Sequence, residues 1–345
     1  MRPLARVPAD PRLTGDAPPP GAPYLDPASG TWILSRYRDV LSAFREPRLR
    51  PAGSVGEDAG GPRDHTGALV QRPAVQEALS ATRMAAWQGQ AEALAEDLLG
   101  RLPPNGAVDL LQRFAMPWCL QLGLTASGAN PADGKRLSRL AELSFAGTGL
   151  PRRAFLRRRR SAAAVAELQR YFFPSTIPLA QSTFVGTAQT LPRLLANAWL
   201  ALFRHPAEVA RLRADPGLMP LAVEELLRYA GIIPRLFRKV NADVDLGGLR
   251  LTAGERVTLM INSANRDPER FPEPHRVDIS RPGSGQLSLG IGHCSCAGAR
   301  FVRMALGVSI TMILGMFEQI GVTGTIRWRS DHLCWPLSVP VTLRR

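Results

Sequence analysis

The sequence predicts a mainly α-helical fold with a minor β component. Ala and Leu recur at three- and four-residue spacing over residues 65–102, which is typical of a helix, and further helical stretches follow along the chain. Short alternating stretches around paired glycines, DVDLGGLRL and ERVTLMIN, indicate strands. The sequence shows no internal repeat and no clear linker. We therefore expect one domain over residues 24–345, preceded by a flexible lead-in over residues 1–23.

The first half of the chain opens with a strand and then becomes helical. A strand over residues 32–34 is followed by a helix that ends at the breaker Pro47. The other expected elements are a Gly/Pro-rich loop over 50–64, a helix over 65–102, and further helices to about 146 with breaks at 103–106 and 128–134.

The second half centres on one long helix over about 176–204. Pro192 removes an amide donor inside this helix and should kink it. The other expected elements are helices over 161–173, 206–214 and 220–229, strands around a turn at Gly247–Gly248, a loop over 265–293, a helix over about 297–317 and a β tail over 325–344.

Composition narrows the location of the protein. No window contains about eighteen consecutive uncharged apolar residues, so we expect no membrane span. The most apolar run, residues 304–317, is predicted to be a buried core helix. The N-terminus is rich in Arg and Pro and has no apolar signal-peptide region. We expect a cytoplasmic protein.

The formal net charge of +14 suggests an acidic partner. Nucleic acid is unlikely on sequence grounds, because only 6% of residues are aromatic and no nucleic-acid motif is present. Two interpretations remain for the densest basic cluster: a solvated helix face, or a docking patch for an acidic redox or carrier protein. The cluster consists of Arg152, Arg153, Arg157, Arg158, Arg159 and Arg160.

One of the four cysteines lies in a distinctive context. Cys296 is surrounded by Gly290, Gly292 and Gly298 and comes directly before an expected helix. Glycines allow unusual backbone angles and close approach of a flat ligand. The helix N-terminus aims free amides at the sulfur, which favours a thiolate. A zinc site is not expected, because only Cys294 and Cys296 are close in sequence and no second ligand pair accompanies them.

The stretch 287–306 resembles the ligand loop of the cytochrome P-450 superfamily, F-x-x-G-x-H/R-x-C-x-G. The resemblance implies that Cys296 is the metal ligand, binding the iron of haem b (iron protoporphyrin IX). Two positions depart from the motif: Leu289 replaces the aromatic residue, and Cys294 replaces the residue that contacts a haem propionate, although His293 lies beside it. Without the resemblance, the loop would be a glycine-rich turn with two buried cysteines.

A second motif supports the resemblance. Glu225 and Arg228 match the family's E-x-x-R, and residues three apart on a helix can pair. In the family a third residue, an arginine, joins this pair in a structural charge cluster. Aligning the segment that follows E-x-x-R with the family places this arginine at Arg276. The P-E-R-F sequence at 268–271 looks similar but lies too early in the alignment.

The resemblance also implies residues that contact the haem propionates. Arg238 occupies the position of a propionate-binding arginine, although an exposed arginine at a strand end is the alternative. His65 matches the first residue of the family's H-T-x-x-R. The arginine position is Leu69, and Arg72 one turn later is the candidate substitute. Gly290, Gly292, Gly298, His293 and Cys294 complete the predicted cofactor-binding set.

The predicted catalytic residues, Thr190 and Gln189, lie on the central helix. There the family's A/G-G-x-D/E-T falls on residues 186–190, and Gln189 replaces the acid. A glutamine amide forms hydrogen bonds but cannot move a proton by titrating. Two interpretations remain. In the first, water and Thr190 are sufficient for proton delivery. In the second, the enzyme does not perform ordinary hydroxylation, and it either oxidises its substrate by ring closure or coupling or uses peroxide.

The resemblance covers residues 31–341, with the fold truncated at the N-terminus and in the lid region. We therefore expect a haem-thiolate oxidoreductase, a monooxygenase or an oxidative cyclisation or coupling enzyme. Its substrate is expected to be a small-molecule or carrier-bound secondary metabolite, and its electron donor a ferredoxin-type protein. The shortened lid implies a more open pocket, or a partner that completes it. The alternative is a catalytically impaired scaffold that docks an acidic partner, and a nucleic-acid binder is the weakest interpretation.

Overall fold

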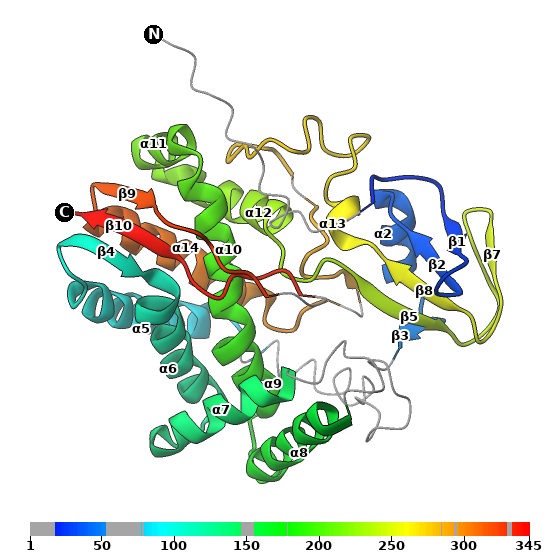
Figure 1. Cartoon of the computed structure of the whole chain (residues 1–345), viewed down its shortest axis with the longest axis horizontal. Helices are drawn as coiled ribbons and strands as arrows, with labels where there is room; N and C mark the ends of the chain where they lie inside the picture. Colours follow the sequence, from blue (N-terminus) through cyan, green and yellow to red (C-terminus); the bar gives the residue numbers. More distant parts are fainter. Residues whose placement is uncertain are drawn as a thin grey trace.

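The computed structural model describes residues 18–52, 77, 79–145, 155–177, 179–283, 285–292, 295–329 and 333–345. Figure 1 shows a helical part and, beside it, a smaller part rich in β structure. The predicted mainly α architecture with minor β structure is confirmed.

The helical part is built around one long segment that crosses the molecule (Figure 1). It comprises α9 (Ala180–Val185), a π-helical turn η3 (Gly186–Thr190) and α10 (Leu191–Phe203). Twelve residues of α10 are buried, as expected for a helix that is apolar on nearly every side. The irregularity expected near Pro192 takes the form of the π turn, which ends immediately before α10.

Other helices pack around this segment. They are α5 (Ala81–Gly100), η1 (a π turn, Leu111–Ala115), α6 (Met116–Ser127), η2 (3-10, Pro131–Asp133), α7 (Gly134–Phe145), α8 (Phe155–Phe172), α11 (Pro206–Ala214), η4 (3-10, Pro216–Leu218), α12 (Met219–Tyr229) and α14 (Ala299–Met316). Stacked rings of Phe114, Trp118 and Trp199 join η1, α6 and α10, with centroids 5.4 and 5.7 Å apart. Large buried aromatic surfaces of this kind contribute strongly to a core.

α14 is the helix predicted from the most apolar run of the sequence. Among the described residues it alone is long and apolar enough to cross a membrane, judged by length and composition. It contacts α5, α10 and α12, and Ala305, Ile310 and Ile313 are fully buried in the main hydrophobic cluster. These contacts are those of a core helix.

The smaller part contains a five-stranded sheet in the order β1-β2-β8-β5-β3. Its strands are β1 (Tyr24–Asp26), β2 (Thr31–Leu34), β8 (Arg256–Leu259), β5 (Leu236–Val240) and β3 (Leu49–Pro51). Strand β2 runs parallel to β8, whereas the other pairs are antiparallel. Two short helices, α2 (Tyr37–Arg45) and α13 (Ile261–Ala264), accompany this sheet.

Two further sheets complete the architecture. Strand β10 (Pro340–Arg344) lies between β4 (Asn105–Asp109) and β9 (Gln319–Val322), and β6 (Val244–Leu246) pairs with β7 (Leu249–Leu251). The turn predicted at Gly247–Gly248 joins β6 and β7, and both glycines have positive φ, 60° and 92°. Within the described residues of the β tail predicted over 325–344, the strand is β10 at its end, and one isolated bridge joins Trp328 and Pro336.

Several predicted boundaries were wrong. α8 begins at Phe155 rather than residue 161, because the arginine run is part of the helix. The break at 103–106 contains the start of β4, which has one buried residue and so shows no alternation. α9 begins at residue 180 rather than 176. The predicted helix over 65–102 is seen as α5, and its part before residue 77 lies outside the described residues.

Candidate functional site

The cysteine loop leads directly into α14. The amide of Cys296 donates to the carbonyl of Leu289 at 2.7 Å, and the carbonyl of Cys296 accepts from the amide of Ala299 at 3.1 Å. Gly290 and Gly292 have φ of 67° and 64°, the left-handed region that favours glycine. The loop therefore turns back on itself and presents Cys296 at the N-terminus of the helix, as predicted.

The environment of the Cys296 sulfur differs from the expectation of a lowered pKa. The side chain is reached by solvent, yet the surrounding chain still desolvates it, and this burial raises the pKa of the thiol. The amide of Gly298 and the charge of Arg303 act in the opposite direction but are outweighed.

Space is open beside the loop. A Cβ added at Gly298, two residues after the cysteine, would meet no atom within 4 Å, and the same holds for Gly186 on the central segment. An accessible soft sulfur with open space on its flank fits a flat ligand whose metal prefers thiolate. The residues present are therefore compatible with haem.

The loop is fixed from behind by Asn265. Its side-chain oxygen accepts from the amide of Leu287 at 2.8 Å, and its Nδ2 donates to Ser288 Oγ at 2.9 Å. Ser288 Oγ in turn donates to the carbonyl of Leu227 in α12 at 2.7 Å. These bonds attach the loop that carries the cysteine to α12.

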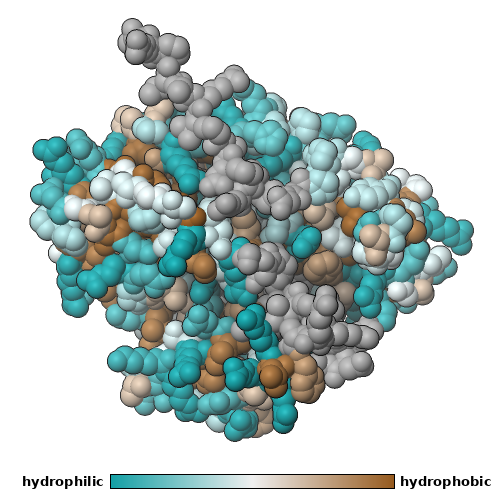
Figure 2. All heavy atoms as spheres, in the orientation of Figure 1, coloured by the Kyte–Doolittle hydropathy of each residue, from teal (hydrophilic) through white to brown (hydrophobic). Residues whose placement is uncertain are grey.

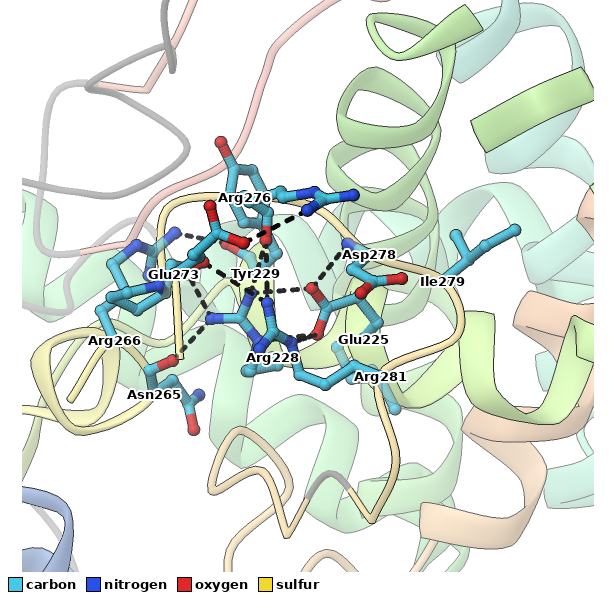
Figure 3. A network of polar contacts seen from close by, with 12 residues as sticks. Glu225, Arg228, Tyr229, Asn265, Arg266, Glu273, Arg276, Asp278, Ile279 and Arg281 are labelled. Atoms are coloured by element: carbon cyan, nitrogen blue, oxygen red, sulfur yellow. Dashed lines mark hydrogen bonds and ion pairs between the residues drawn. The ribbon is translucent and has the colours of Figure 1, made fainter. Parts of the chain in front are cut away.

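A buried ion cluster supports the same helix (Figure 3). Glu225 and Arg228 are both 0% exposed and form two hydrogen bonds, Nε–Oε2 at 2.7 Å and Nη2–Oε1 at 2.8 Å. The predicted pairing on α12 is confirmed. Arg228 Nη1 also donates to the carbonyl of Asn265 at 2.8 Å, so the cluster and the loop support share a residue.

Arg276 was wrongly predicted as the third member of this cluster. Its side chain pairs with Glu273 at 3.2 Å and faces outward, while its carbonyl accepts from Arg228. The side chain beside the buried carboxylate belongs to Arg281, whose Nε lies 3.1 Å from Glu225 Oε2. Arg276 meets the cluster through its backbone instead, because its carbonyl accepts from Arg228 and Arg281 at 3.2 and 3.3 Å.

Arg266 is a further buried residue that the sequence did not reveal. Its Nη2 donates to the carbonyl of Tyr229 at 2.6 Å, and its Nη1 donates to that of Asn262 at 3.2 Å. Burial, with the nearby charge of Arg228, lowers the pKa of Arg266 to about 10. We find no local signal that would have singled it out.

Among the predicted cofactor residues, Arg238 lies on β5 and is 4% exposed. Its Nη1 donates to the carbonyl of Phe237 at 3.0 Å, and its guanidinium lies 5.8 Å from the ring centroid of Phe44. It is therefore not the exposed strand-end arginine of the alternative interpretation. His65, Arg72, His293 and Cys294 lie outside the described residues.

The predicted catalytic pair lies on the π turn. Thr190 is half-buried, and Gln189 is 2% exposed. Gln189 Nε2 donates to the carbonyl of Ser138 in α7 at 3.1 Å, and its Oε1 accepts from Arg193 Nη1 at 2.8 Å. The side chain of Gln189 therefore uses both its donor and its acceptor groups within the protein.

Comparison with known proteins gives consistent results. The family model described as cytochrome P-450 matches residues 213–333. Vitamin D(3) 25-hydroxylase of Pseudonocardia autotrophica is 30% identical over 364 residues, covering 92% of this chain and 89% of that protein. Cyclomarin C epoxidase CymV of Salinispora arenicola is 29% identical over 335 residues, covering 85% of each.

The fold is shared with a solved structure. P450BioI, crystallised with an acyl carrier protein ligated to hexadec-9Z-enoic acid, superposes with a TM-score of 0.81 at 21% identity, covering 91% of this chain and 92% of that one. The fold and the relatives define the class of protein as a haem-thiolate oxidoreductase, and they do not favour the impaired scaffold. The chain belongs to the cytochrome P-450 family.

Proposed function

We propose that the protein binds haem b with Cys296 as the axial ligand to iron. The observation that carries this proposal is the accessible sulfur of Cys296, presented by a closed backbone turn at the start of α14. Gly290, Gly292 and Gly298 allow the loop to approach the porphyrin. Arg238 would bind a propionate, with His65, Arg72, His293 and Cys294 as further contacts from outside the described residues.

When bound, the haem supplies dioxygen activation and the oxidation of a substrate held nearby. The protein's own contribution on the distal side would come from the π turn. We propose that the Thr190 hydroxyl donates a hydrogen bond and, with water, delivers protons there. Gln189, at the acid position, would act by hydrogen bonding rather than by titration, because an amide has no proton to give at ordinary pH.

The proposed substrate is a secondary metabolite, either free or attached to a carrier protein. Carrier attachment is supported by the acyl carrier protein in the P450BioI complex and by the surface of α8. On that helix Phe155 and Leu156 are 65% and 70% exposed and precede the exposed Arg157, Arg159 and Arg160. Figure 2 shows hydrophobic atoms exposed among hydrophilic ones at the end of the molecule where α8 lies. Basic charge around an apolar contact fits an acidic carrier protein.

We further propose a ferredoxin-type electron donor and a cytoplasmic location. Residues 24–345 would constitute one haem-binding domain.

A spectrum of the reduced protein under carbon monoxide tests the proposal that Cys296 binds haem iron, because thiolate-ligated haem gives a strongly red-shifted Soret band. Cys296→Ser should abolish this band, and Cys294→Ser should retain it. Loss of the band in Cys294→Ser alone would show that the ligand has been misassigned by two positions.

A further inference from the structure

The side chain of Gln189 connects two helices. It extends from the π turn to the carbonyl of Ser138, four residues into α7, with an Nε2–O distance of 3.1 Å. Its Oε1 accepts from Arg193 Nη1 at 2.8 Å, and the same nitrogen of Arg193 donates to the backbone carbonyl of Gln189. Arg193 thus spans the turn immediately before α10 and holds the Gln189 amide in one orientation.

Arg193 is itself held by an aromatic ring from the C-terminal segment. Its guanidinium lies 4.9 Å from the ring centroid of Trp335, and that of Arg329 lies 5.0 Å from the same ring. Arg329 Nη2 donates to the carbonyl of Phe145 at 3.1 Å, and the ring of Phe145 meets Trp335 edge-on at 6.0 Å. α7 is therefore attached at both Ser138 and Phe145.

The arrangement places the positive charges of Arg193 and Arg329 near the same buried ring, which is unfavourable without compensating contacts. Burial, together with the charge of Arg329, lowers the pKa of Arg193 to about 10, and this net decrease includes the opposing effects of Glu142 on α7 and Cys119 on α6. Two guanidinium groups near one buried ring are favourable only while the ring and the backbone carbonyls hold them in place. Movement of α7 away from the central segment would break the contacts made by Ser138 and Phe145 and would take the charge of Glu142 away from Arg193.

We propose that Gln189 and Arg193 are positioning residues that latch α7 onto the π turn, and that the latch requires an amide at position 189. An amide donates to the Ser138 carbonyl and accepts from Arg193 at the same time. A carboxylate would keep the contact with Arg193 but would face the carbonyl oxygen without a proton to donate. The replacement of the acid at this position is thereby explained by a contact with α7. Because Thr190 lies on the same turn, the latch also holds the backbone that carries it.

Hydrogen–deuterium exchange of the haem-loaded full chain tests this proposal. In Gln189→Glu, the protection of amides in α7 should fall by about tenfold, the size expected when one hydrogen bond is lost and a carboxylate faces the Ser138 carbonyl oxygen in its place. The protection of α12 should stay unchanged. Gln112→Glu is the matched control, because Gln112 is exposed and also donates to a carbonyl, that of Leu337 at 3.3 Å.

The opposite outcome is equally specific. The alternative is that the acid at position 189 was lost by neutral drift and that the contact with α7 does not require an amide. In that case Gln189→Glu would gain an ion pair with Arg193, and the amides of α7 would keep or increase their protection. That result would overturn the proposal. Should the Glu variant fail to fold, Gln189→Met provides the test. It lacks both polar groups and should lower the protection of α7 by about tenfold while leaving α12 unchanged. Equal protection of α7 in the Met variant and the natural protein also overturns the proposal.

Discussion

Arg281 Nε lies 3.1 Å from Oε2 of Glu225, so this fully buried carboxylate contacts two guanidinium groups, those of Arg228 and Arg281. The amide of Asp278 donates to the other oxygen, Oε1, at 3.0 Å. Both oxygens of the carboxylate are therefore satisfied by charged or backbone donors, as a buried charge requires.

Arg281→Gln is expected to destabilise the protein by about 2–4 kcal/mol, because it removes one partner of a buried charge. Arg276→Gln, the control, alters an exposed pair with Glu273 and should change the free energy of unfolding by less than about 1 kcal/mol. Urea denaturation of both variants measures the difference. A larger loss in Arg276→Gln than in Arg281→Gln would contradict the observed arrangement.

Asn265→Ala should loosen the cysteine loop. The change leaves the amide of Leu287 without its acceptor and Ser288 without its donor, at a cost of about 1–3 kcal/mol for the buried amide. We expect faster haem loss to an acceptor protein in excess, with the secondary structure retained by circular dichroism. Asn241→Ala, at an exposed position, is the control. An unchanged rate of haem loss in Asn265→Ala would argue against Asn265 as a support of the loop.

Gly231→Ala should damage the same loop by a steric route. A Cβ at Gly231 would lie 2.5 Å from Ser288 Oγ and 3.2 Å from Ser288 Cβ. Ser288 cannot move freely, because its hydroxyl bonds to Leu227 and Asn265. Haem content per chain should fall in the single variant and recover partly in the double variant with Ser288→Gly, which removes both contacting atoms. Gly100→Ala has open space and should have no effect on haem content.

Charge reversal on α8 tests the proposed carrier surface. Arg157, Arg159 and Arg160 changed together to Glu should weaken binding of an acyl carrier protein by tenfold or more at low salt, and the difference should shrink as salt rises. The matched control reverses Arg250, Arg256 and Arg344, which are exposed on strands of the three sheets. Fluorescence anisotropy of a labelled carrier protein measures the affinities. Equal weakening in both triple variants would indicate attraction to net charge rather than to α8.

Elements with strong periodicity were predictable from the sequence. α2, α12 and α14 follow the expected ranges closely, because each buries several apolar residues whose spacing appears in the sequence. α11 also follows its expected range, with Pro206 at its first position as the local signal. β3 and β4 were not predictable. Each has one buried residue, and each depends on a distant partner, as in the pairing of Val108 with Val341. Such strands are specified by tertiary pairing rather than by local pattern.

The candidate site shows the same division. The pairing of Glu225 with Arg228 could be predicted, since it depends only on three-residue spacing within a helix. Arg281 could not, because its approach to Glu225 depends on the path of a loop that begins beyond α13. The raised pKa of Cys296 was also missed, because desolvation by surrounding chain outweighs the helix amides and has no sequence signal.

The parallel pairing of β2 with β8 joins residues 31–34 to residues 256–259, so most of the helical part lies in the intervening chain. Closing so long a loop is entropically unfavourable until the intervening helices have become compact. We therefore expect the helical part to collapse first and the five-stranded sheet to form late in folding. In that order, Arg238 on β5 would reach its native position after α12 and its buried ion cluster have formed.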